Sequence, residues 1–223
     1  GMRLINEETV LNQIIDSNMV MKCVAYENGI SMGDISVEDI SEILKREHTF
    51  IWLGLREANE DLLLKIQEEF GLHDLAIEDA CSAHQRPKIE EYGDSLFIVL
   101  HTAHLGKQQV EFGETHLFLG SRFLVTVRHG ASHSLSKVRE RCQAMPSQLA
   151  KGPGFALYSI MDFIVDNYML VIDGLQARFD VLESSIFQHR PSRQTMEGLY
   201  ELKRELLLLE GAINPVIDIC NEL

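Results

Sequence analysis

The hydrophobic and polar positions divide the chain into two regions with different periods. From about residue 18 to 130, short apolar runs alternate with amphipathic stretches, as in strands alternating with helices. Asn59 and Gly71 are predicted to begin and end one helix, and Gly120-Ser121 suits a tight turn between two strands. We expect strands at 19–26, 49–53, 96–104, 115–119 and 123–127, and helices at 36–48 (with Ser36 as the cap), 60–70 and 74–81.

From about residue 134 onward, apolar positions recur every three or four residues, which predicts helices. We expect a shorter helix at 136–145 and two long helices at 155–187 and 193–223, which should pack antiparallel because only a short break separates them. Pro215 should kink the second long helix rather than end it. The predicted stripes are Ile164, Tyr168, Val171, Leu175, Phe179, Leu182 and Ile186, and Leu199, Leu202, Leu206, Leu209, Ile213, Val216 and Cys220.

Together these patterns predict an α/β fold. An α/β/α layered domain with a mixed sheet should occupy residues 1–133, and a helical region ending in a long antiparallel hairpin should occupy residues 134–223. No run approaches the roughly 18 apolar residues that suggest a membrane span, so we expect no span within this chain.

The charge of the chain narrows the classes of function. There are 34 Asp and Glu against 20 Lys and Arg, which gives a formal net charge of −14. An acidic surface repels phosphate backbones and attracts cations, so we expect no nucleic-acid partner. The four cysteines are far apart and form no C-x-x-C, which favours reduced thiols over a zinc site. Without a glycine-rich phosphate loop, G-x-S-x-G or H-E-x-x-H, we expect no enzyme.

Acidic side chains are the candidate metal ligands. Mg²⁺ prefers carboxylate oxygens and keeps much of its water shell, so a site needs only one or two acidic groups. Glu78 and Asp79 are adjacent, and Asp162 and Asp166 lie four apart on one helix face, although this spacing also fits a solvated face. His101 and His104 lie three apart in a strand, so they should point to opposite faces as ordinary strand residues.

Three segments in order resemble the CorA family of magnesium and cobalt transporters. They are HDLAIED at 73–79, HQRPKIE at 84–90 and LFIVL at 96–100. Residues 157–166 and 202–206 are similar to parts of the family's two long cytosolic helices. The resemblance extends from about residue 18 to the end of the sequence.

This resemblance implies a homopentameric channel in the inner membrane that carries Mg²⁺, Co²⁺ or other divalent cations. The present portion would be its regulatory part facing the cytoplasm, and the stalk and membrane helices would lie outside this sequence. In the family, acidic residues between neighbouring cytosolic domains bind magnesium and hold the closed pentamer. Asp79 and Asp162 match such positions, and Glu78 lies beside Asp79.

The basic segment is expected to be a structural turn with local ion pairing rather than a binding site. It consists of His84, Gln85, Arg86, Pro87 and Lys88. Two other functions stay open at this point. One is the cytosolic domain of a related zinc transporter, and the other is a soluble helical scaffold that binds a partner protein along the stripe at 199–220.

Overall fold

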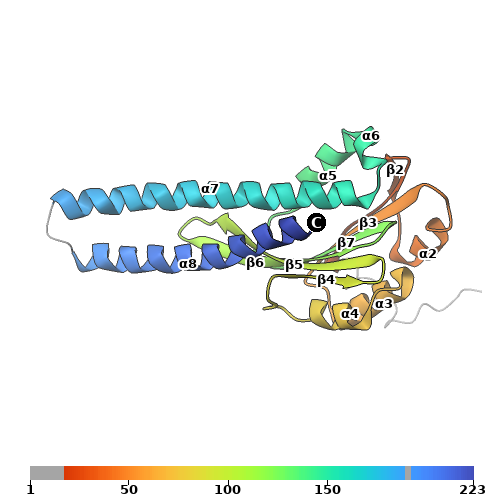
Figure 1. Ribbon diagram of the computed structural model, residues 1–223, viewed down its shortest axis with the longest axis horizontal. Helices are drawn as coiled ribbons and strands as arrows, with labels where there is room; N and C mark the ends of the chain where they lie inside the picture. The colour runs from red at the N-terminus through yellow and green to blue at the C-terminus, as the bar shows by residue number, and fades with distance from the viewer. Residues whose placement is uncertain (1–17, 189–191) are drawn as a thin grey trace, which may run out of the picture.

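A seven-stranded mixed sheet lies between two layers of helices in the computed structural model, which describes residues 18–188 and 192–223 (Figure 1). The strand order is β2-β1-β3-β7-β6-β5-β4. Strands β3 and β7 are parallel, and the other neighbouring pairs are antiparallel. The predicted α/β/α layering, mixed sheet and helical hairpin are therefore confirmed.

The strands and helices have the following bounds. The strands are β1 (Val20–Glu27), β2 (Ile30–Asp34), β3 (Thr49–Arg56), β4 (Lys88–Tyr92), β5 (Ser95–Leu105), β6 (Val110–Leu119) and β7 (Phe123–Gly130). The helices are η1 (Val37–Asp39), α2 (Ile40–Ile43), α3 (Glu60–Phe70), α4 (Asp74–Ala80), α5 (Ser136–Gln143), α6 (Pro146–Leu149), α7 (Pro153–Gln188) and α8 (Arg193–Glu222).

Helix α3 begins and ends where its sequence predicts. The Asn59 side chain accepts a hydrogen bond from the Leu62 amide at 2.9 Å, which satisfies one of the free N–H groups of the first turn. Gly71 closes the helix in the left-handed region at φ 70°, which glycine adopts without a steric penalty. This helix positions α4, which follows directly.

The helix predicted at 36–48 is wrong in length, because only η1 and α2 form there. The Ser36 hydroxyl donates to the Asp39 carboxylate at 3.2 Å and makes no bond to the backbone of η1. The Thr49 hydroxyl lies 3.2 Å from the Ile43 carbonyl and 2.7 Å from the Arg46 carbonyl. These contacts satisfy carbonyls that a longer helix would have used.

Strands β2 and β4 were not predicted, because neither has an apolar pattern of its own. The five residues of β2 are exposed, and β4 reads Lys-Ile-Glu-Glu-Tyr. Both are edge strands that pair on one side with β1 and β5 respectively. Charged and exposed residues are common on such edges, since these hinder pairing with another chain.

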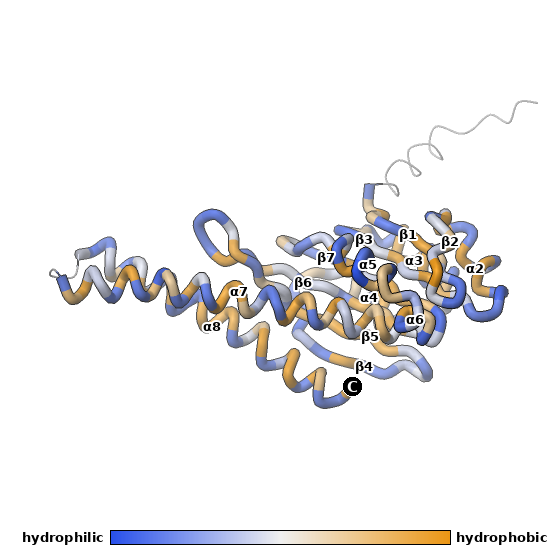
Figure 2. The backbone as a smooth tube through the Cα atoms, turned by 90° about the horizontal axis from the view of Figure 1, so that it is seen from above, coloured by the Kyte–Doolittle hydropathy of each residue, from blue (hydrophilic) through white to orange (hydrophobic). Residues whose placement is uncertain are grey.

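The two long helices form the predicted antiparallel hairpin, which projects beyond the sheet (Figure 1). On α7, Ile164, Tyr168, Val171 and Leu175 are buried as predicted. Phe179, farther along the helix, is 41% exposed. Helix α8 runs through Pro215, and Figures 1 and 2 show it changing direction in its C-terminal part.

The buried stripe of α8 differs from the predicted one. Leu202, Leu209 and Val216 are buried, but Leu206 is 47% exposed and Cys220 is exposed. Helix α8 contacts β4 and β5 as well as α7, so its buried side is rotated toward the sheet. The buried residues of α8 are Leu202, Glu205, Leu209, Ala212, Val216 and Ile219.

Two hydrophobic cores lie on opposite faces of the sheet. One packs the sheet against α2, α3 and α4, with Leu53, Ile66 and Ile77 among its residues. The other packs it against α5, α6, α7 and α8, and it includes Trp52 and Ile160. The second core therefore joins residues from both sides of the boundary expected at 133/134, which stays a prediction.

Helix α7 is, among the described residues, long and apolar enough by length and composition to cross a membrane. Sequence inspection missed this because polar residues interrupt its apolar run. In the structure α7 lies along the sheet, and nine of its residues are buried. This packing accounts for the apolar character of one side of the helix.

Candidate functional site

Helix α4 carries the first pair of candidate metal ligands. Glu78 is exposed, whereas Asp79 is half-buried. Asp79 forms an ion pair with Lys88, in which Nζ of Lys88 lies 2.5 Å from Oδ2 of Asp79. Lys88 also contacts Glu90 at 2.6 Å. Burial of the ammonium lowers the pKa of Lys88, but the hydrogen bonds and charges of Asp79 and Glu90 together outweigh burial, so that the pKa is raised. The Asp79 carboxylate thus faces an internal cation in this chain.

The second pair of candidate ligands lies on the other side of the sheet. Asp162 and Asp166 are both exposed on α7, while α4 packs against the opposite face (Figure 1). The structure does not bring Asp79 and Asp162 together within one chain. Within residues 18–188 and 192–223, no group of three or more His, Cys, Asp or Glu side chains could hold a metal ion.

The basic segment forms the connection from α4 to β4. His84 has φ 68°, Arg86 is exposed, and Pro87 is half-buried. The Gln85 carbonyl lies 2.7 Å from Nε2 of His101, so the imidazole donates to it. Lys88 is the first residue of β4, where it makes the ion pairs described above.

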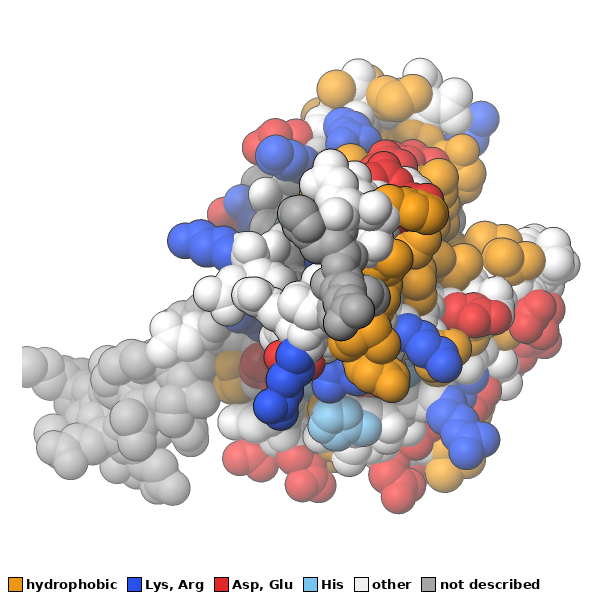
Figure 3. Space-filling model, turned by 90° about the vertical axis from the view of Figure 1, so that its left-hand side faces the viewer, with side chains coloured by type: hydrophobic (Ala, Val, Ile, Leu, Met, Phe, Trp, Pro, Cys, Tyr) orange, Lys and Arg blue, Asp and Glu red, His pale blue; other side chains and the backbone are white. Residues whose placement is uncertain are grey.

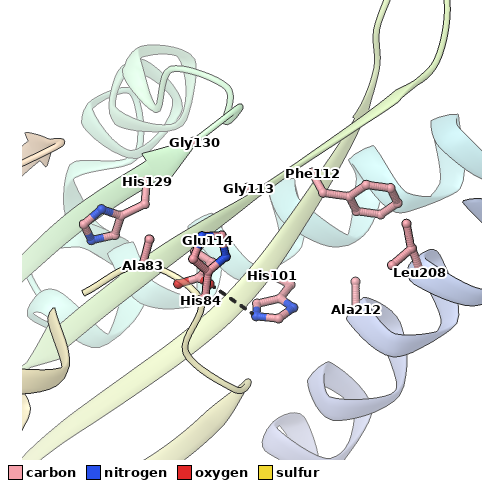
Figure 4. A pocket seen from close by; sticks show the side chains of 10 residues that line it. All are labelled: Ala83, His84, His101, Phe112, Gly113, Glu114, His129, Gly130, Leu208 and Ala212. Atoms are coloured by element: carbon pink, nitrogen blue, oxygen red, sulfur yellow. Dashed lines mark ion pairs between the residues drawn. The ribbon is translucent and has the colours of Figure 1, made fainter. Parts of the chain in front are cut away.

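A cavity of about 270 Å³ lies between this connection, three strands and α8 (Figure 4). Glu114 is 8% exposed and lies 3.7 Å from Nε2 of His101 and 2.8 Å from Nε2 of the buried His116. The His129 ring lies tilted against the His116 ring, with the ring centroids 4.7 Å apart. Leu208 and Ala212 of α8 line the cavity opposite these polar groups.

These buried groups favour a definite charge state. Burial raises the pKa of Glu114, but the hydrogen bond that it accepts from His116, together with the other polar groups around it, outweighs burial, so that the pKa is lowered. Burial lowers the pKa of His116. We infer an ionised Glu114 beside a neutral His116 that donates from Nε2. His129 donates from Nε2 to the Ala80 carbonyl at 3.2 Å, which connects the cluster to the end of α4.

Comparison with known proteins places this architecture in a family. The sequence model of the family described as CorA-like Mg²⁺ transporter protein matches residues 47–223, which include β3 to β7 and both long helices. The chain belongs to the CorA-like family. The resemblance read from residues 73–100 is thereby confirmed.

Two relatives of this CorA-like chain are transporters by name. The putative metal ion transporter YfjQ of Bacillus subtilis is 32% identical over 180 residues, which are 81% of this chain and 56% of that protein. The cobalt/magnesium transport protein CorA of Thermotoga maritima is 27% identical over 196 residues, 85% of this chain and 56% of that protein. The chain therefore spans about half the length of these relatives.

Two solved structures share the fold of the CorA-like chain. The soluble domain of CorA from Methanocaldococcus jannaschii has a TM-score of 0.66 at 18% identity and covers 90% of this chain and 78% of its own. The ZntB cytoplasmic domain from Vibrio parahaemolyticus has a TM-score of 0.59 at 11% identity, with coverage of 90% and 80%. At these identities the likeness concerns the fold alone.

Sequence reasoning missed the cluster around Glu114 in the CorA-like chain. Strand register explains it, since His101 is opposite Glu114 across β5 and β6, and Glu114 is opposite His129 across β6 and β7. The predicted turn at Gly120-Ser121 could have revealed this cluster, because a turn fixes the register of the two strands that it joins. Pairing strands outward from it aligns Leu119 with Leu124 and hence Glu114 with His129.

Apolar side chains are also exposed on the helical hairpin of the CorA-like chain. Figure 3 shows hydrophobic side chains gathered along one flank of the hairpin, seen from its far end. A mostly apolar groove of about 510 Å³ lies between α7 and the C-terminal end of α8. Asp162 is one of the residues that line it. The most exposed apolar residues of the two helices are Tyr158, Leu170, Val181, Phe187, Tyr200, Leu207 and Leu223.

Proposed function

We propose that this chain is the cytosolic, divalent-cation-sensing part of a magnesium or cobalt transporter of the CorA-like family. The family match over residues 47–223 carries the proposal, because it includes both helices with the candidate ligands, α4 and α7. The relatives are named as ion transporters, and the chain spans about half of their length. Transport would be performed by the whole protein in the inner membrane, with this part facing the cytoplasm.

The positions of the acidic residues support sensing between subunits. Since α4 and α7 cover opposite faces of one sheet, an ion bound by Asp79 and Asp162 together would require two copies of the chain. In a ring such as a homopentamer, α4 of each copy could face α7 of the next. A divalent cation between facing carboxylates would cancel their repulsion and hold the ring together. Loss of the ion would loosen it.

Zinc transport is the second candidate, favoured by the shared fold of the ZntB cytoplasmic domain. Magnesium is the better proposal, because the candidate ligands Glu78, Asp79, Asp162 and Asp166 are all carboxylates, which suit a hard cation. Sedimentation velocity in Mg²⁺ and in Zn²⁺ compares the effects of the two ions on assembly directly.

The test is sedimentation velocity of the chain in chelator, in millimolar Mg²⁺ and in Zn²⁺. We expect Mg²⁺ to shift the wild type toward larger assemblies and to do so less in Asp79→Asn and Asp162→Asn. Asp61→Asn is the matched control, since Asp61 is an exposed acidic residue on α3. A wild type that stays monomeric with and without Mg²⁺ would contradict sensing by this part of the protein.

A further inference from the structure

Lys88 lies between two carboxylates that come from different elements. In β4 the alternate residues Lys88, Glu90 and Tyr92 point to one face, toward α4. The Lys88 ammonium is 2.5 Å from Oδ2 of Asp79 and 2.6 Å from Oε1 of Glu90. The Tyr92 hydroxyl donates to the other oxygen of Glu90. The side chains of Lys88 and Asp79 are only 27% and 28% exposed.

The surroundings hold this arrangement in place. The Lys88 ammonium is 5.8 Å from the centroid of the Phe97 ring on β5. The His73 ring at the start of α4 stacks on Tyr92, with the centroids 4.2 Å apart. His129 binds the Ala80 carbonyl at the other end of α4. Helix α4 is therefore attached to the sheet at both ends, with the ammonium between Asp79 and Glu90.

The charges of this group do not cancel. Two carboxylates share one ammonium, which leaves a net charge of about −1 when the groups have their usual charges. The hydrogen bonds from Lys88 and then Tyr92 lower the pKa of Glu90, and the bond to Glu90 raises the pKa of Tyr92 to about 12. Glu90 is thus an ionised carboxylate at neutral pH, and carboxylate oxygens are what Mg²⁺ prefers.

We propose that Lys88 is a built-in competitor for the cation site at Asp79, so that a divalent cation can bind there only after the Lys88 ammonium has been displaced. This inference rests on the proposed function of Asp79. The four-carbon stem of lysine lets the ammonium turn toward solvent when the ion binds. Lys88 would thereby weaken the site and set the cation concentration at which the sensor responds.

Replacing Lys88 by a neutral residue should then tighten binding. In Lys88→Met the two carboxylates would lose their internal partner, and a divalent cation could neutralise both. We expect the dissociation constant for Mg²⁺ to fall by about tenfold, which corresponds to about 1.4 kcal/mol. The gain should disappear in the double variant Lys88→Met/Asp79→Asn.

The experiment is calorimetric titration of the chain with Mg²⁺ for the wild type, Asp79→Asn, Lys88→Met and the double variant. Lys45→Met is the matched control, because Lys45 forms an exposed ion pair with Glu42 at 2.7 Å. Lys88→Gln provides a polar neutral replacement if Lys88→Met does not fold. In the wild type, nuclear magnetic resonance of lysine ammonium groups should show the Lys88 signal changing as Mg²⁺ binds.

The outcomes separate this inference from the proposed function. Tighter binding in Lys88→Met that requires Asp79 supports competition by Lys88, even if the wild type does not assemble with Mg²⁺. If the wild type binds through Asp79 but neither Lys88 variant binds more tightly, competition is wrong and cation sensing stands. If Mg²⁺ binds neither the wild type nor the Lys88 variants, both ideas fail at Asp79.

Discussion

At the scale of single residues, buried charge explains the most specific features of this protein. Glu114 and His116 are neighbours on one face of β6, and both are buried beside His129. Since His116 is fully buried, its neutral form is favoured in the folded protein and its pKa is lowered. The unfolded chain has no such preference, so this residue connects folding to pH.

The stability of the protein should fall as the pH decreases below about 6.5, the ordinary pKa of histidine. In that range His116 binds a proton in the unfolded chain but stays neutral in the folded protein, so acid favours unfolding. His116→Gln keeps an amide donor for Glu114 but cannot titrate, and we expect it to lose less stability between about pH 7 and pH 5. Urea unfolding at several pH values measures this difference.

His48→Asn is the control for this prediction, because His48 is exposed with φ 58°, a region that asparagine tolerates. It should keep the pH dependence of the wild type. If the free energy of unfolding falls equally with decreasing pH in the wild type and in His116→Gln, His116 does not cause the pH dependence.

At the scale of elements, a buried carboxylate joins the helical hairpin to the sheet. Glu205 is 4% exposed on α8, accepts from the Val110 amide at the start of β6 at 3.1 Å, and pairs with Arg178 of α7. The heptad spacing predicted Leu206 in the seam, yet Leu206 is exposed and Glu205 takes its place. A buried charge is tolerated here because both of its oxygens have partners.

Glu205→Ala should lower the free energy of unfolding by about 2 to 3 kcal/mol, because it leaves the Val110 amide and Arg178 without their partner. Glu210→Ala on the exposed side of the same helix should change it by less than about 0.5 kcal/mol. Chemical denaturation of both variants measures the difference. If Glu205→Ala and Glu210→Ala have equal free energies of unfolding, Glu205 does not anchor the hairpin.

At the scale of the whole molecule, the sheet and the long helices share one hydrophobic core. Trp52 of β3 and Val138 of α5 belong to the same cluster as Tyr168 of α7 and Leu209 of α8. A division of the chain at residue 133/134 would separate residues that pack on one another. We therefore expect the two regions to unfold together, as small single domains commonly do.

Fluorescence and circular dichroism can test this cooperativity. Trp52 is the single tryptophan, is fully buried and reports on the sheet, whereas circular dichroism reports mainly on the helices, of which α7 and α8 are the longest. The two signals should give the same urea midpoint. A helical transition at a clearly different urea concentration would instead support independent domains at 1–133 and 134–223.

The sequence by itself determined the elements that carry strong local signals. Asn59 and Gly71 mark the ends of α3, Gly120-Ser121 separates β6 from β7, and regular apolar spacing indicates α7 and α8. Such signals depend on propensity and period within one element, so they can be read without knowing its neighbours. The motifs at residues 73–100 likewise identified the family.

Only the tertiary structure decided which residues meet across elements. The edge strands β2 and β4 exist because β1 and β5 offer backbone hydrogen bonds, and the buried side of α8 is set by contact with the sheet. The same is true of Lys88 with Asp79, which lie nine residues apart on a strand and a helix. Such contacts depend on strand pairing and layer packing, which no local period encodes.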